Sequence, residues 1–247
     1  MDNYEFCANY VSKMAAGKPT TVLDYGCGAG HIVKALRGVG IAAKGCDIFY
    51  AGGDYSSRVP PELLGSAIKP MENGLIPFSD NSFDIVVNNQ VLEHVEDIDS
   101  ALAEIHRVLK PGGQVLSMFP DKSVWREGHC GIPFLHWFPK GSQSRVYYAA
   151  FLRLVGMGYH KGDKTIWQWS QDFCEWLDKW TCYRSYQEIR AAFDRHFEKL
   201  THIEEVWLQE RFGHRLAIIG WVPKQTGQWV VRKLGGLVFL CTKPGRL

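Results

Sequence analysis

The feature that most constrains the fold is residues 21–30, TVLDYGCGAG, in which a short run typical of a buried strand leads into a glycine-rich turn. Glycines occupy every second position of this turn, at Gly26, Gly28 and Gly30. They let the backbone adopt positive φ and let a ligand approach the chain closely. The helix predicted from His31 presents its positive end to that ligand. A strand, a glycine turn and a helix in this order predict a nucleotide site at the mouth of a parallel sheet.

The spacing of the glycines narrows the choice of nucleotide. A dinucleotide fingerprint has the form G-x-G-x-x-G, whereas here the third glycine comes one residue early, and the chain has no G-x-x-x-x-G-K-[ST] motif. The form acid-x-Gly-x-Gly-x-Gly, which begins at Asp24, resembles motif I of the class I S-adenosylmethionine-dependent methyltransferases. The cationic amino-acid end of that cofactor suits Asp24 and backbone carbonyls better than a phosphate nest would. The resemblance implies that Tyr25 and Cys27, within the turn, also contact the cofactor.

Asp47 ends the second predicted strand, residues 42–46, about 20 residues after the glycine turn. An acidic residue at this place can bind the two ribose hydroxyls of a nucleotide. Ile48, its neighbour, is expected to line the same site. The alternative interpretation is a solvated acid at the end of a strand.

A second stretch, residues 71–89, also resembles the methyltransferase pattern, because an acid precedes a Leu-Pro-Phe-like triplet, here residues 76–78, and a Phe-Asp pair. By this match Glu72 accepts a hydrogen bond from the adenine amino group and Asn73 lies beside the ring. The family more often has Asp at this position, and a solvated turn acid is the alternative. Asn89 and Gln90 follow the apolar strand predicted at residues 85–88 and are expected at the cofactor.

The resemblance covers roughly residues 20–120, through a helix capped by Asp97 and a strand at residues 114–118. It implies an α/β fold, with a doubly wound, mostly parallel seven-stranded sheet and helices on both faces. The predicted core of the cofactor domain is residues 1–120, in which a first helix either covers the cofactor or simply packs. Residues 185–247 complete the same domain, with elements predicted as follows: a helix at 185–196, a strand at 202–207, a largely helical stretch at 216–233 and a closing antiparallel strand at 237–242.

Residues 121–184 form a predicted insertion after the fifth strand, mainly helical and rich in aromatic residues. Six of the nine tryptophans lie there. Trp169, Phe173, Trp176 and Trp180 recur at helical spacing, which favours packing over ligand binding. Residues 125–139 combine aromatics and histidines with prolines and glycines. Such a loop is expected to line the site as a substrate cap.

Methyl transfer from a sulfonium is an in-line displacement, in which the enzyme mainly aligns the reactants. An oxygen acceptor must also lose its proton, a task that suits a histidine. His94, in the loop after the fourth strand, is the first candidate, followed by His129 and His136 from the insertion. The alternative for His94 is a helix-entry residue that shapes the pocket. His129, Cys130 and His136 lack a full ligand set, so no metal is predicted.

Features that the chain lacks narrow the class of methyl acceptor. Enzymes that methylate amino groups of bases or glutamine typically carry [DN]-P-P-[FY] after the fourth strand, whereas this chain has Asn88-Asn89-Gln90-Val91. The net charge of +2 gives no electrostatic footprint for nucleic acid. We expect O-methylation of a small molecule, a glycan or a lipid-linked intermediate. The alternatives are a non-catalytic scaffold that binds S-adenosylmethionine and an NAD-dependent sugar-modifying oxidoreductase, although the chain has no Tyr-x-x-x-Lys pair.

The seven cysteines are scattered and form no C-x-x-C pair, which favours reduced thiols in a soluble, cytoplasmic protein. The apolar runs at residues 216–222 and 234–241 are shorter than the roughly 20 residues that span a bilayer. Basic residues around Trp221, Trp229 and Val230 permit peripheral membrane contact, with a packed amphipathic helix as the alternative. These residues are Arg211, Arg215, Lys224, Arg232 and Lys233.

Overall fold

The sheet has seven strands in the order β3-β2-β1-β4-β5-β7-β6. The structure of the protein is a computed structural model, which describes residues 1–213 and 224–245. β7 runs antiparallel to both of its neighbours, and the other pairs are parallel, as the family resemblance implies. The strands are β1 (Thr21–Tyr25), β2 (Ala42–Asp47), β3 (Ile68–Pro70), β4 (Phe83–Asn89), β5 (Leu109–Phe119), β6 (Glu198–His202) and β7 (Leu237–Thr242).

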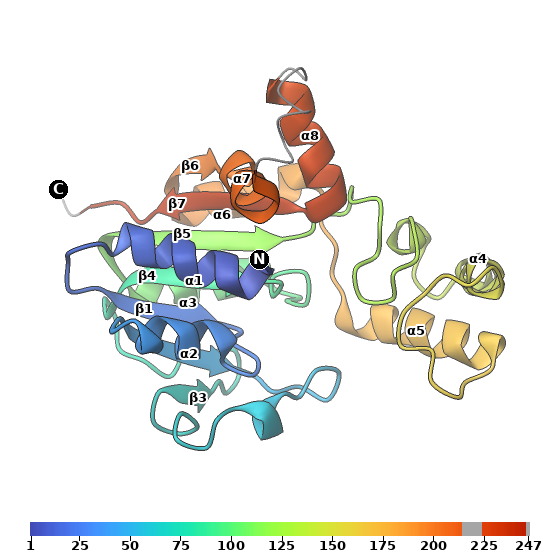
Figure 1. The fold of residues 1–247 in the computed structure, drawn as a ribbon, viewed down its shortest axis with the longest axis horizontal. Coiled ribbons are helices and arrows are strands. Elements are labelled where there is room, and N and C mark those ends of the chain that lie inside the picture. Colours follow the sequence, from blue (N-terminus) through green and yellow to red (C-terminus); the bar gives the residue numbers. More distant parts are fainter. Residues whose placement is uncertain (214–223, 246–247) are drawn as a thin grey trace.

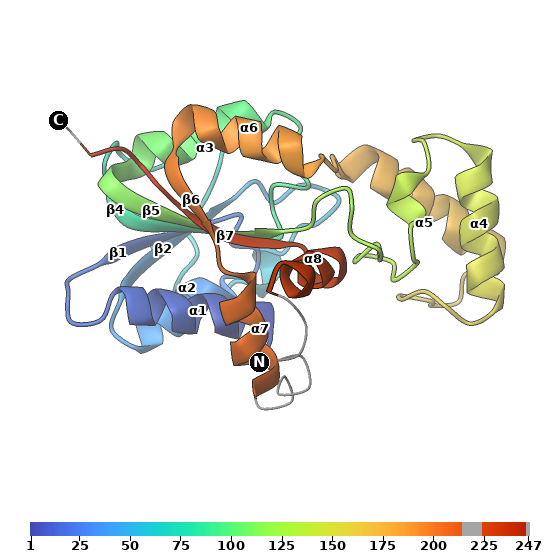
Figure 2. The same ribbon diagram turned by 90° about the horizontal axis from the view of Figure 1, so that it is seen from above.

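Helices cover both faces of this sheet, which confirms the doubly wound α/β fold (Figure 2). α3 and α6 pack together on one face, and α1, α2 and α7 lie on the other. Each face has its own buried apolar cluster. The helices are α1 (Asn3–Met14), α2 (His31–Gly38), α3 (Ile98–Val108), α4 (Gln143–Leu154), α5 (Ile166–Trp180), α6 (Tyr186–His196), α7 (Glu204–Phe212) and α8 (Lys224–Gly235), with short 3-10 turns η1 (Ser56–Arg58) and η2 (Leu135–Trp137).

The insertion projects beyond the carboxyl ends of β1, β4 and β5 (Figure 1). α4 and α5 pack against each other around a separate apolar cluster, which includes Trp169, Cys130 and Leu135. The aromatic residues predicted at helical spacing between 169 and 180 do not all pack in one place. Trp169 is fully buried in this cluster, whereas Trp176 faces the cavity described below. The insertion is therefore a small packed unit that overhangs the edge of the sheet where ligands bind in α/β folds.

The boundaries of α3 and β5 can be compared with those predicted from the sequence. Asp97 caps α3 as expected, because its side chain accepts a hydrogen bond from the backbone N–H of Ser100. α3 ends at Val108, and β5 begins at Leu109, earlier than the strand predicted at residues 114–118. Leu109 pairs with Phe83, and a register shift then accommodates residues 110–113.

The strand predicted at residues 202–207 is wrong. The strand is β6, which ends at His202, and α7 begins at Glu204. Ile203 and Trp207 are both buried, four residues apart on one face of this helix, so the apolar spacing is that of a helix. Of the stretch predicted as helical at 216–233, residues 224–233 belong to α8, and the rest lies outside the described residues.

No helix in the described part of the chain has the length and apolar character needed to cross a bilayer. The basic surface predicted near the C-terminus is described only in part, because Arg215, Trp221 and the side chain of Lys224 lie outside it. Val231 of α8 packs into the core, and Arg232 donates a hydrogen bond to buried Glu204 at 2.9 Å. These contacts are those of a packed amphipathic helix.

Candidate functional site

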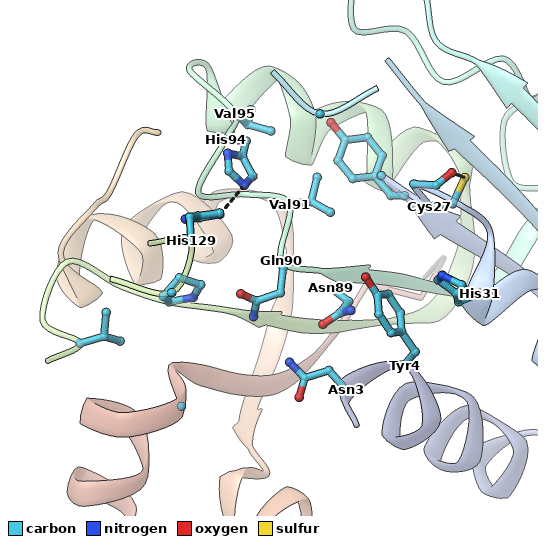
Figure 3. A pocket seen from close by; sticks show the side chains of 18 of the residues that line it. Asn3, Tyr4, Cys27, His31, Asn89, Gln90, Val91, His94, Val95 and His129 are labelled. Atoms are coloured by element: carbon cyan, nitrogen blue, oxygen red, sulfur yellow. Dashed lines mark hydrogen bonds between the residues drawn. The ribbon is translucent and has the colours of Figure 1, made fainter. Parts of the chain in front are cut away.

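A cavity of about 1050 Å³ opens at the carboxyl ends of β1, β2 and β4, beneath the insertion (Figure 3). α1, α8 and the insertion contribute to its walls. Most of the site residues predicted from the sequence line it, and they come from four separate segments: Tyr25, Gly26, Cys27, Gly28, Asp47, Ile48, Asn89, Gln90, His94 and His129. Asp24, Gly30, Glu72, Asn73 and His136 are not among its lining residues.

The glycine turn has the close packing that its sequence predicts. The N–H groups of Gly26 and Cys27 donate to the carbonyl of Cys46 at 2.8 and 3.1 Å. Gly26 has a φ of +71°, and a Cβ atom there would lie 2.4 Å from Val91 of the loop after β4. Only glycine therefore fits at position 26, both in backbone conformation and in space.

Asp47 joins this turn to the second strand. Its Oδ2 accepts a hydrogen bond from the Gly28 N–H, and its Oδ1 accepts one from the Phe49 N–H, both at 2.8 Å. Each carboxylate oxygen keeps a further lone pair for a ligand hydroxyl. Burial raises the pKa of Asp47, while these N–H groups lower it. Asp47 thus holds the turn and also faces the cavity.

Asp24 lies behind the turn and is only 3% exposed. Burial, and then the charge of Asp47, raise its pKa well above the usual range. A buried carboxyl group whose pKa is raised in this way favours a cationic ligand, which would offset its charge.

α1 packs on the sheet and also lines the cavity, while its predicted role in covering the cofactor remains a prediction. Asn3 and Tyr4 line the cavity, and the Tyr4 ring lies 5.0 Å from the His31 ring at the start of α2. Phe6 and Val11, farther along the helix, are buried in the apolar cluster on this face of the sheet. The contact residues Asn3 and Tyr4 carried no sequence signal of their own, because their position depends on how α1 docks.

Glu72 and Asn73 lie in an exposed turn, where Glu72 forms an isolated bridge with Leu75. Asn73 has a left-handed φ of +51°. Their neighbour Met71 lines the cavity instead. The adenine contacts assigned to Glu72 and Asn73 therefore remain predictions.

Two of the three predicted catalytic histidines meet at the end of the cavity beneath the insertion (Figure 3). The Nε2 atoms of His94 and His129 are 3.2 Å apart. His94 Nδ1 donates to the carbonyl of Trp180 at 2.7 Å, which leaves its Nε2 as an acceptor. Burial lowers the pKa of His94 to about 4, so this ring is neutral near pH 7.

Glu127 orients His129. One of its oxygens accepts from His129 Nδ1 at 2.6 Å and from the Tyr183 hydroxyl at 2.7 Å, and the other accepts from the Cys130 N–H at 2.8 Å. Burial opposes ionisation, yet these partners lower the pKa of Glu127 to about 2. Burial lowers the pKa of His129, but the hydrogen bond to Glu127 and the charge of Glu127 outweigh burial and raise it. Sequence reasoning missed Glu127, although its spacing two residues before His129 was visible.

Glu93 adjoins the two histidines and is 1% exposed. Neither of its carboxylate oxygens receives a hydrogen bond from another described residue. Burial raises its pKa to about 8. Its place next to His94 in the sequence was the only available signal for it.

His136, the third candidate, is 6% exposed and packs against the ring of Tyr183 rather than into the cavity. Cys130, once considered with it as a ligand, belongs to the apolar cluster of the insertion. Trp176 is instead beside the histidine pair, with its ring 5.0 Å from that of His129. The predicted site loop, residues 125–139, thus contributes Arg126, Gly128 and His129 to the cavity.

The fold defines the class as a Rossmann-like α/β protein, with a cavity at the carboxyl edge of its sheet, where ligands bind in such folds. Residues 23–117 match the family model described as "Methyltransferase domain". This segment is thus similar to the class I S-adenosylmethionine-dependent methyltransferases, an enzyme family whose cofactor is S-adenosylmethionine.

The chain is 33% identical over 114 residues to a malonyl-[acyl-carrier protein] O-methyltransferase of Erwinia billingiae, across 45% of this chain and 42% of that protein. It is also 33% identical over 102 residues to a ubiquinone/menaquinone biosynthesis C-methyltransferase of Desulfotalea psychrophila, across 37% and 42% of the two chains. The chain thus spans less than half the length of these curated relatives.

A solved S-adenosylmethionine-dependent methyltransferase from Mesorhizobium loti has a similar fold, with a TM-score of 0.54 at 15% identity. The alignment covers 98% of this chain and 100% of that chain. The likeness therefore extends over the whole sheet, beyond the segment that the sequence matches cover.

Proposed function

We propose that this protein transfers the methyl group of S-adenosylmethionine to an oxygen of a small molecule, a glycan or a lipid-linked intermediate. One observation carries the proposal: a single cavity runs from the glycine turn past Asn89 and Gln90 to His94 and His129. One end has the features for the nucleoside and its cationic amino-acid group, and the other is enclosed by the aromatic insertion.

The residues have distinct tasks in this proposal. Asp47 accepts hydrogen bonds from the ribose hydroxyls, and the charge of Asp24 offsets that of the ammonium group. Bound S-adenosylmethionine supplies a methyl group on an activated leaving group. The acceptor oxygen forms a bond to the methyl carbon as the carbon–sulfur bond breaks, and the electron pair of that bond stays on sulfur. Alignment within an enclosed cavity provides much of the rate enhancement.

The acceptor oxygen must lose its proton, and His94 and His129 line the insertion end of the cavity, together with Arg126 and Tyr183. We assign activation of the acceptor to the histidine pair. His136 packs away from the cavity, so its catalytic role has no support in the geometry. The absence of [DN]-P-P-[FY] and the near-neutral net charge disfavour nucleic-acid bases as acceptors.

Isothermal titration calorimetry with S-adenosylhomocysteine and with NAD tests the nucleotide assignment. We expect S-adenosylhomocysteine to bind and NAD not to bind. Asp47→Asn should weaken the first affinity about 10-fold or more, as expected for a hydrogen bond to a charged group. Asp163→Asn, an exposed acid outside the cavity, should leave it unchanged. Binding of NAD instead would favour the oxidoreductase alternative.

Turnover is tested separately, by release of S-adenosylhomocysteine in the presence of hydroxylated small molecules, glycans and lipid-linked acceptors. Release that depends on one acceptor supports the proposal, and mass spectrometry of the product locates the new methyl group. Cofactor binding without release in any acceptor class would favour the scaffold alternative. Methyl transfer to carbon or nitrogen would contradict the oxygen assignment.

A further inference from the structure

Glu93, His94 and His129 bring a carboxylate oxygen and two imidazole nitrogens together, with the three ligand atoms all within 4.8 Å of one another. We propose that these residues bind a divalent first-row transition-metal ion, for which Zn²⁺ is the probe, and that the open side of the ion faces the acceptor. The second half of this inference rests on the proposed function, whereas the metal site itself does not.

The two Nε2 atoms have the separation of ligands on one ion. Nitrogens about 2.05 Å from a tetrahedral Zn²⁺ lie about 3.3 Å apart, and His94 Nε2 and His129 Nε2 are 3.2 Å apart. Figure 3 shows the two rings meeting through these atoms. With both Nδ1 atoms engaged elsewhere, the two Nε2 atoms are left to share one proton or one cation between them.

The second nitrogen of each ring is held as metal-binding histidines usually are. Such rings donate their other N–H to a carboxylate or a backbone carbonyl, which fixes the tautomer and the ring orientation. His129 Nδ1 lies 2.6 Å from buried Glu127, and His94 Nδ1 lies 2.7 Å from the Trp180 carbonyl. Both kinds of partner are therefore present, one on each histidine.

The environment of Glu93 favours a metal ion over a proton between His94 and His129. A proton on His129 Nε2 would satisfy the two histidines alone, but it would leave Glu93 unexplained. Both carboxylate oxygens of Glu93 are buried without a hydrogen bond from another described residue. A buried carboxylic acid without a hydrogen-bond partner is costly, and a buried carboxylate is more costly still unless it is paired or coordinates a metal. An ion between the histidines supplies the missing partner.

The donor set selects the kind of ion. Imidazole nitrogen favours zinc and similar transition metals, whereas magnesium and calcium prefer oxygen ligands throughout. Three protein ligands with one open position are typical of catalytic zinc sites. His94 and His129 line the cavity while Glu93 lies behind them, so the open position faces the cavity. An acceptor oxygen bound there would lose its proton to solvent more readily, because the ion stabilises the anion, and the histidine pair would then activate the acceptor through the ion rather than as a base.

The test begins with protein freed of metal by a chelator and then titrated calorimetrically with ZnCl₂. We expect one ion per chain, with MgCl₂ giving no comparable binding. Glu93→Gln and His94→Gln should each weaken Zn²⁺ binding at least 10-fold. His160→Gln replaces an exposed histidine outside the cavity and should bind as the unaltered protein does.

Cobalt absorption provides a second measurement in the unaltered protein, in case the buried substitutions prevent folding. Co²⁺ should give the intense visible bands of a four- or five-coordinate site, and Zn²⁺ should displace it. Only weak octahedral bands, no stoichiometric Zn²⁺ binding, or an affinity unchanged by both Glu93→Gln and His94→Gln would each overturn the inference.

Titration of the same metal-free sample with S-adenosylhomocysteine separates the two proposals. If S-adenosylhomocysteine binds but Zn²⁺ does not, the metal site is wrong and the proposed function stands. If Zn²⁺ binds but S-adenosylhomocysteine does not, the proposed function fails and the metal site stands.

Discussion

At the scale of single residues, the end of the cavity at the glycine turn lies beside groups whose burial is unfavourable without a ligand. Asp24 is buried close to Asp47, and both have a raised pKa because burial disfavours the charged form. Gln90, at the end of β4, has a left-handed φ of +58°, which is uncommon for a residue other than glycine. Unfavourable features of this kind are typical of binding sites.

The raised pKa of Asp24 predicts how stability without ligand depends on pH. Its pKa in the folded protein lies above that in the unfolded chain. Between the two values the folded protein binds more protons, so stability falls as pH rises through this window and remains lower above it. Asp24→Asn removes the charge, and the variant should melt at a higher temperature at pH 7.5, with the difference shrinking as the pH approaches about 4.

The same substitution should weaken S-adenosylhomocysteine binding about 10- to 100-fold, because it removes a charged partner of the ligand. Thermal melts across pH and calorimetry on one preparation measure both effects. A variant less stable than the parent at pH 7.5, or one with unchanged affinity, would contradict the role assigned to Asp24.

At the scale of elements, one arginine ties the insertion to the loop after β4. The guanidinium of Arg184 donates to the carbonyls of Leu92, Val95, Glu96 and Cys182 at 2.6–3.2 Å. The first three belong to the loop that carries Glu93 and His94. Arg184, at the end of the insertion, thus helps to fix the position of His94 in the loop after β4.

Arg184→Leu should therefore lower the free energy of unfolding by about 2–3 kcal/mol, since hydrogen bonds that involve a charged group are the stronger ones. Urea denaturation followed by circular dichroism measures the change. Arg190→Leu is a matched control on α6, where the arginine makes an exposed ion pair with Asp194, and should cost at most about 1 kcal/mol. Equal losses in the two variants would show that the four carbonyl contacts contribute nothing special.

At the scale of the whole molecule, the sheet domain and the insertion have separate apolar clusters. The cluster around α4 and α5 contains far fewer buried residues than the two beside the sheet, and so excludes less apolar surface from water. The proposed division of the chain at residues 121 and 184 is consistent with this separation. It predicts that the insertion opens more readily than the sheet.

Hydrogen–deuterium exchange followed by mass spectrometry tests this prediction. Amides of α4 and α5 should exchange faster than those of β4 and β5. S-adenosylhomocysteine at 100 times its Kd should stabilise the protein by about 2.7 kcal/mol, with added protection at the glycine turn and α1. Exchange at one common rate across the insertion and the sheet would contradict the separation.

What the sequence by itself determined are the features encoded within a few consecutive residues. The glycine turn, Asp47 at the end of β2 and the cap at Asp97 follow from local backbone requirements and apolar spacing, whereas the arrangement of the strands was implied by the family resemblance. The strand predicted at 202–207 failed because a short apolar run fits either period, and the packing of Ile203 and Trp207 selected the helix.

Only the tertiary structure decided which side chains meet. His129 lies 35 residues after His94 in the chain, yet their Nε2 atoms are in contact, whereas His136 from the same loop turns away. Glu127, Tyr183 and Glu93 join that cluster from segments with no motif to connect them. Contacts between distant segments depend on how the insertion docks over the sheet, and docking is set by packing over the whole molecule rather than by local residue patterns.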